Sequence, residues 1–185
     1  MNMRYFVTVV LFIASMTGAK AKNNISVDYT EESELVSVIA HLAKVPGYIW
    51  PEEQAGVIDY FHQVDSTFAP YSNHPIMAFV ADSLVKQGFG YHVPVAMALR
   101  LKLKNGKLHY NTDLEPDFNH YYRGITPQHE KKLIALLEDF YKKAHFHSFF
   151  KKNQPLYNAC KQAMQQQLVD KIDLDWYKSF FGPIN

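Results

Sequence analysis

Apolar side chains recur at the spacing of an α-helix along most of this chain. The pattern begins with Leu35, Val38, Ile39 and Leu42, which share one helix face because steps of three and four residues bring side chains together. Similar stripes follow in later segments, and Pro or Gly residues separate them. Amphipathic segments in series pack on one another around a shared core. The sequence therefore predicts a mainly α protein with six or seven helices.

Local signals predict where these helices begin and end. Helix N-termini are predicted from capping residues and from prolines at the first helical position. These signals are Thr30, Pro51, His74-Pro75, Thr126-Pro127, Asn153 and Asp173. Gly88 and Gly182 are expected to end the third and the last helix. The stripe after Asn153 comprises Leu156, Cys160, Met164 and Leu168, so Cys160 is expected to be buried and inert.

The 13 Phe, 12 Tyr and 2 Trp residues fall mostly on these stripes, which predicts one aromatic-rich core. Val93 to Leu101 is apolar on nearly all sides and predicts a buried helix. After it, residues alternate around Asn105-Gly106, which is typical of a minor β-hairpin over 101–110. A short strand is also expected at Ile25 to Val27.

The N-terminus has the pattern of a secretory signal peptide. Arg4 precedes the apolar run Tyr5 to Met16, and Ala19-Lys-Ala21 fits a cleavage site. The apolar run is shorter than the roughly 20 residues that span a bilayer. We therefore expect residues 1–21 to be removed, and an uncleaved anchor is the alternative. The remainder, 22–185, is expected to be a single helical domain, exported to the periplasm or secreted, with no membrane association.

Composition limits the classes of function. The 19 Lys and Arg nearly balance the 18 Asp and Glu, and no basic stripe is present, so nucleic-acid binding is not expected. Cys160 is the only cysteine, so no disulfide can form within the chain. Because the aromatic residues fall at core spacings, a carbohydrate-stacking surface is not expected either.

A search for catalytic and metal-binding patterns finds none. His129-Glu130 begins an H-E-x-x-H string, but Leu133 stands where the second His would be. His145 and His147 diverge on a helix and have no carboxylate or Cys at ligand spacing. We therefore expect no catalytic residue, no metal ligand and no cofactor site in this chain.

Binding candidates are few. His74 is expected to cap the third helix and is a weak candidate for ligand contact. His120 and Tyr121 lie in a predicted long loop, Asn111 to Gly124, and loops of that length are often functional. The last helix carries Trp176, Phe180 and Phe181, which we interpret as a candidate interaction face for self-association or for a protein partner.

Several of these segments together resemble an uncharacterised family of exported bacterial proteins, known only as a domain of unknown function. The resemblance covers nearly all of the mature chain. It rests on the order of scaffold motifs, each unspecific by itself: Glu34 to Ala43, Tyr60-Phe61, Phe68, Tyr71-x-x-His74-Pro75, Val93 to Leu101, Leu133 to Tyr141 and Asp173 to Gly182. Longer members of that family continue to an H-E-x-x-H helix and look like zincin-type metallopeptidases. The resemblance implies zinc in those longer proteins, but no residue of this chain matches the metal-binding segment.

Three hypotheses follow. The chain is the non-catalytic N-terminal half of such a metallopeptidase, shortened at its C-terminus and inactive alone, in which case Trp176, Phe180 and Phe181 are expected to be poorly covered. Alternatively, it is a complete, non-enzymatic binding module for a protein or peptide outside the cytoplasm. The third hypothesis is a small enzyme that uses Asp117, His120 and Tyr121.

Overall fold

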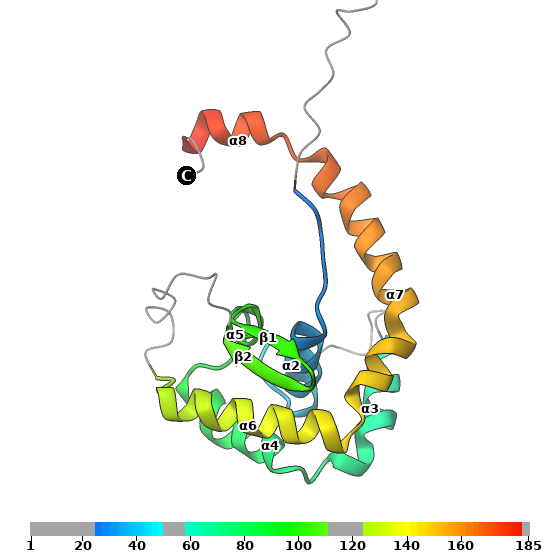
Figure 1. Ribbon diagram of the computed structural model, residues 1–185. Coiled ribbons are helices and arrows are strands. Elements are labelled where there is room, and N and C mark those ends of the chain that lie inside the picture. Colours follow the sequence, from blue (N-terminus) through cyan, green and yellow to red (C-terminus); the bar gives the residue numbers. More distant parts are fainter. Residues whose placement is uncertain (1–24, 50–57, 111–123, 183–185) are drawn as a thin grey trace, which may run out of the picture. The chain divides into compact units, whose positions relative to one another are not determined.

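The computed structural model describes residues 25–49, 58–110 and 124–182 (Figure 1). These residues belong to two compact units. The larger unit comprises Tyr29–Asn158, and the smaller one contains the described residues up to Asp28 and from Ala159 onward. The predicted signal peptide, the predicted start of the second helix at Pro51, and His120 and Tyr121 lie outside the described residues. Each unit is treated separately below.

The described residues are mainly helical, as predicted. In chain order, the helices and strands are α2 (Glu31–Leu42), α3 (Ile58–Phe68), α4 (Pro75–Ala78), α5 (Val93–Leu99), β1 (Leu101–Lys104), β2 (Lys107–Tyr110), α6 (Pro127–Lys143), α7 (Phe146–Gln167) and α8 (Leu174–Phe181). None of the helices that the structure describes combines the length and the apolar character that crossing a membrane requires.

Three predicted caps are present. The Thr30 hydroxyl accepts a hydrogen bond from the backbone N–H of Ser33 at the start of α2. At the start of α6, Thr126 accepts from the N–H of His129, whose ring in turn accepts from the N–H of Thr126. Asp173 accepts from the N–H of Trp176 at the start of α8. Each contact satisfies an amide that a helix N-terminus leaves without a partner.

The third predicted helix is less regular than expected. His74 caps α4 through its Nδ1, which accepts from the N–H of Ile76, but the chain then continues as a π-helix over Phe79–Leu84 and a 3₁₀ turn over Val85–Gln87. Gly88 ends this stretch with φ of +90°, as predicted. The widened π turn adds one residue to a turn and changes which side chains face inward, so a regular 3.6-residue spacing does not describe this segment.

The predicted β-hairpin is confirmed. Strands β1 and β2 pair antiparallel, with Leu101 opposite Tyr110 and Lys104 opposite Lys107. Asn105 and Gly106 form the turn and have positive φ values of 53° and 70°. Two consecutive positive φ values suit the right-handed twist of a two-residue hairpin, and Asn-Gly adopts them at low cost. The carboxylate of Glu138 on α6 accepts a hydrogen bond from the N–H of Leu108, which attaches the hairpin to α6.

The core of the larger unit is aromatic, as predicted. Phe68 at the end of α3 lies 4.9 Å from Phe149, 5.5 Å from Phe140 and 5.9 Å from Phe146, measured between ring centroids. These rings join α3, α6 and α7. Because centroid separations in this range give favourable ring–ring contact in addition to burial, the cluster fixes how the three helices pack.

Two predictions for α7 are wrong. Asn153 does not cap a new helix: α7 runs without a break through it and through Pro155, and the Asn153 amide donates to the carbonyl of Phe149. Since Pro155 has no N–H, one of the amides that an Asn153 cap would bind is missing. Cys160 is exposed and not buried. Its expected stripe-mates Leu156, Met164 and Leu168 are exposed as well.

The contacts of the smaller unit explain the exposure of Cys160, Met164 and Leu168. There α7 contacts the chain around Ile25–Asp28 through polar side chains: Gln165 binds the carbonyl of Ile25 and the N–H of Val27, and Lys161 pairs with Asp28 at 3.0 Å. Residues 25–27 form no strand, because a single side-chain amide occupies the backbone groups that a neighbouring strand would bind. In this part of α7 the polar face makes the contacts, which leaves the apolar stripe exposed.

The predicted buried helix over Val93 to Leu101 is shorter and only partly buried. It ends at Leu99, and Leu101 belongs to β1. Val93, Pro94, Met97 and Ala98 are buried, whereas Val95 and Leu99 are exposed. The prediction from its nearly all-apolar sequence therefore overestimated how much of α5 is buried.

Candidate functional site

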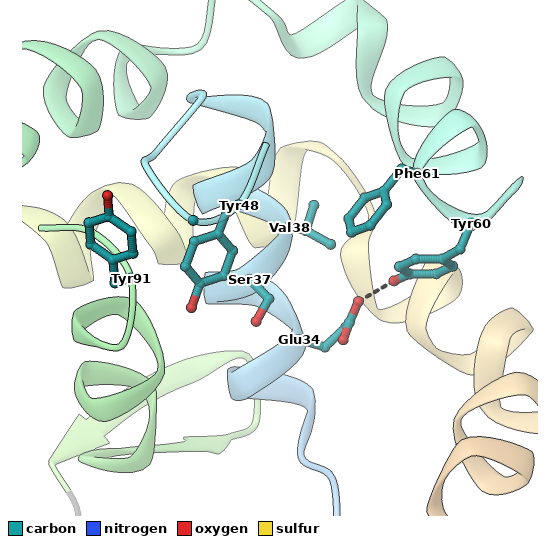
Figure 2. A pocket seen from close by; sticks show the side chains of 8 residues that line it. Glu34, Ser37, Val38, Tyr48, Tyr60, Phe61 and Tyr91 are labelled. Atoms are coloured by element: carbon teal, nitrogen blue, oxygen red, sulfur yellow. Dashed lines mark hydrogen bonds between the residues drawn. The ribbon is translucent and has the colours of Figure 1, made fainter. Parts of the chain in front are cut away.

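The larger unit contains a cavity of about 390 Å³ on one face of α2. Its lining residues come from α2, from the chain after it, from α3 and from the turn before α5; they are Glu34, Ser37, Val38, Gly47, Tyr48, Tyr60, Phe61 and Tyr91. We call this cavity the aromatic pocket. Figure 2 shows Glu34, Ser37 and Val38 along α2, with Tyr48 and Tyr91 to one side and Tyr60 and Phe61 to the other. Its volume is within the usual range for sites of small organic ligands.

Glu34 is the acidic group of the aromatic pocket. Its carboxylate accepts a hydrogen bond from the hydroxyl of Tyr60 (Figure 2). It also accepts one from the hydroxyl of Tyr157, and the two hydroxyls lie 3.0 Å apart. Burial raises the pKa of Glu34, and the two hydroxyl contacts oppose part of this increase. Burial, together with the Glu34 charge, also raises the pKa values of Tyr60 and Tyr157. Both hydroxyls therefore stay protonated near neutral pH and act as donors to Glu34.

His41 does not line the pocket but holds two of its lining residues, Phe61 and Tyr48, in place. It lies on α2 one helical turn beyond Ser37 and Val38, is buried, and stacks on Phe61 with 4.4 Å between ring centroids. Its Nε2 lies 3.0 Å from the Asp65 carboxylate on α3, and its Nδ1 lies 3.1 Å from the carbonyl oxygen of Tyr48. A single ring thus positions both Phe61 and the backbone at Tyr48.

Tyr91 is held at the pocket by an unusual backbone arrangement. It has φ of +51° and is 73% exposed, while its N–H donates to the carbonyl of Pro46 at 2.8 Å. A positive φ is rare for a bulky residue. Opposite it, Gly47 has φ of +87°, and a Cβ added there would lie 3.1 Å from the Tyr91 Cα and 3.2 Å from its Cδ1. The close approach of these two turns therefore requires glycine at position 47.

The pocket presents ring faces, one half-buried carboxylate and protonated hydroxyls. Strained backbone is often retained where it serves binding, and a pocket with few polar groups and a perturbed carboxyl is the usual form of a ligand site. This combination suits recognition of a ligand.

The sequence candidates lie elsewhere. His74 is buried, its Nε2 lies 3.0 Å from Asp139, and its Nδ1 caps α4, so both ring nitrogens make structural contacts and neither lines the pocket. His120 and Tyr121 lie outside the described residues, as does Asp117. On α8, Trp176 stacks on Phe180 at 5.3 Å, and Phe180 lies 4.8 Å from Phe181. These three side chains are 51%, 69% and 71% exposed.

The histidines considered for metal binding have other contacts. His129 closes the capping box of α6, and His147 lies 2.9 Å from the Glu31 carboxylate. Within the described ranges, no three His, Cys, Asp or Glu side chains are grouped so that they could hold a metal ion.

Sequence reasoning did not find the aromatic pocket. Glu34, Val38 and His41 follow the helical spacing i, i+4, i+7, so a carboxylate on a largely apolar face was the available signal. The contribution of Tyr91 could not be read from the sequence, because it depends on contact between two turns far apart along the chain.

No family model, no curated protein and no solved structure matches the chain.

Proposed function

We propose that the larger unit is a non-enzymatic binding domain, exported from the cytoplasm, that takes up a small ligand or a peptide side chain in the aromatic pocket. The observation that carries this proposal is the half-buried Glu34 carboxylate on a wall of aromatic rings. Keeping an ionised carboxylate there opposes folding, since burial disfavours its charged form. A ligand that interacts with the carboxylate is a physical reason for its presence.

A pocket-filling variant tests this proposal. Ser37→Phe places a ring in the cavity, and Ser66→Phe, at an exposed position of α3 that does not line it, is the matched control. Both are screened against a library of small polar and charged molecules by ligand-observed NMR, with helicity checked by circular dichroism. We expect ligands that bind the unaltered chain and Ser66→Phe but not Ser37→Phe. Ligands that bind Ser37→Phe equally well, or a library without any binder, would overturn the proposal.

A second candidate function uses α8. Its exposed Trp176, Phe180 and Phe181 favour a protein-interaction face, with self-association as the simplest form. The same exposure fits the proposal that the chain is the non-catalytic half of a larger metallopeptidase-like protein. Light scattering tests self-association: a mass above the monomer that Phe180→Ser abolishes supports it. A strict monomer that binds no hydrophobic dye removes its basis.

A further inference from the structure

The charges around the aromatic pocket are unbalanced. Glu34 faces the hydroxyls of Tyr60 and Tyr157, and in the described part of the chain no lysine, arginine or histidine makes an ion pair with it. The nearby His41 contacts the Asp65 carboxylate and the Tyr48 carbonyl. A half-buried carboxylate that donor hydroxyls hold in place, with no ion-pair partner among the described residues, is complementary to a positively charged ligand.

The aromatic rings of the pocket also favour a positively charged ligand. The lining includes the rings of Tyr48, Tyr60, Phe61 and Tyr91. The face of an aromatic ring carries partial negative charge and attracts ammonium groups within about 6 Å, most strongly where water is excluded. An alkylammonium group therefore satisfies the carboxylate and the rings together. An anion would be repelled by Glu34, and a purely apolar ligand would leave the carboxylate without compensation.

The backbone conformation at the pocket rim also supports a binding role for Tyr91. Tyr91 keeps a left-handed conformation that places an exposed ring at the cavity, and Gly47 is required beneath it. An Asn or Gly would adopt this conformation at lower cost. A large exposed ring at such a position is explained if the ring contacts a ligand.

We propose that the aromatic pocket binds an organic ammonium group, with Glu34 as the counter-ion and the surrounding rings as cation–π partners. The group is either the head of a small free amine or quaternary ammonium compound, or the side chain of a lysine in a peptide. This inference rests on the proposed binding function and specifies its ligand class.

The test compares a cation with its neutral isostere. Choline and 3,3-dimethylbutan-1-ol differ in charge but hardly in shape, and a short lysine peptide represents the protein-borne source. Each is titrated into the full chain by calorimetry, and into Glu34→Gln and Asp82→Asn. Glu34→Gln keeps the shape and a hydrogen-bond acceptor, whereas Asp82→Asn removes one negative charge at an exposed position away from the pocket.

We expect choline or the lysine peptide to bind at least tenfold more tightly than the neutral alcohol, and Glu34→Gln to lose at least tenfold of that affinity while Asp82→Asn loses none. The tighter of the two cations identifies the source. If the alcohol binds as well as choline and Ser37→Phe abolishes both, the ammonium inference is wrong and the binding function stands. If neither cation binds, the ammonium inference is wrong, and the library screen alone decides the binding function.

Discussion

The hydroxyl of Tyr60 donates a hydrogen bond to the carboxylate of Glu34, which joins α3 to α2 at the wall of the aromatic pocket. The two residues lie 26 positions apart in the chain. The hydroxyl of Tyr157 on α7 extends this contact. Helices α2, α3 and α7 are thus connected through the one carboxylate of the pocket, so changes at Glu34 are expected to affect ligand binding and local stability together.

Tyr60→Phe removes one donor to the carboxylate. Because that hydrogen bond lowers the pKa of Glu34, its loss is expected to raise this pKa further, and to cost about 1 kcal/mol of unfolding free energy. An NMR pH titration of the Glu34 side-chain carboxyl carbon measures the shift. Tyr141→Phe, which loses a bond to Glu31 instead, is the control and is expected to leave Glu34 unchanged. An unchanged or lower Glu34 pKa in Tyr60→Phe would contradict this account.

The raised pKa of Glu34 predicts a pH dependence of stability. A carboxyl whose pKa is higher in the folded state favours folding most at low pH, and this contribution is lost as pH rises from about 4 through the folded-state pKa. The side chain introduced by Glu34→Gln cannot ionise. The unfolding free energy of this variant, relative to that of the unaltered chain, is therefore expected to increase as pH rises from 4 to 7. Urea denaturation at a series of pH values measures the difference, and a difference that is constant or of opposite sign would refute the prediction.

Gly47 and Gly88 form a natural pair for testing the contact beneath Tyr91. Both have φ near +90°, but a Cβ at Gly88 meets no atom within 4 Å, whereas at Gly47 it meets Tyr91. Gly88→Ala is expected to cost about 1–2 kcal/mol through backbone strain alone. Gly47→Ala is expected to cost more and also to weaken ligand binding, because Tyr91 must move. Equal losses of stability, with unchanged binding, would mean that the Tyr91 contact has no effect.

Tyr91→Asn separates stability from binding. Asn adopts a positive φ more readily than Tyr, so the melting temperature is expected to stay the same or rise, while loss of the exposed ring weakens choline binding several-fold. Thermal unfolding and calorimetry on the same samples measure both effects. Full affinity in this variant would exclude Tyr91 from the site.

Local signals predicted much of the fold. The caps at Thr30, Thr126 and Asp173 and the turn at Asn105-Gly106 depend on a few adjacent residues, and all four are present. The same reasoning failed at Asn153, where two local preferences compete: the cap needs an amide that Pro155 lacks, and the helix continues. It also failed at Cys160, because helical spacing identifies an apolar stripe but not whether another element covers it.

The aromatic pocket could not be predicted for a related reason. Glu34 appeared in the sequence only as part of a helical pattern, and its role arises from tyrosines on α3 and α7. Tyr91 acquires its place through contact with Gly47 on a distant turn. A site assembled from such contacts leaves little trace in the spacing of residues along one element.

The most direct test of the central claim is amide chemical-shift mapping of the chain during titration with choline. We expect the largest shifts on the residues of the aromatic pocket, above all Ser37, Gly47, Tyr48 and Tyr91, and at least tenfold more choline to be needed to produce them in Glu34→Gln. Shifts confined to α8, or the same shifts in Glu34→Gln at the same choline concentration, would contradict an ammonium-binding site at Glu34.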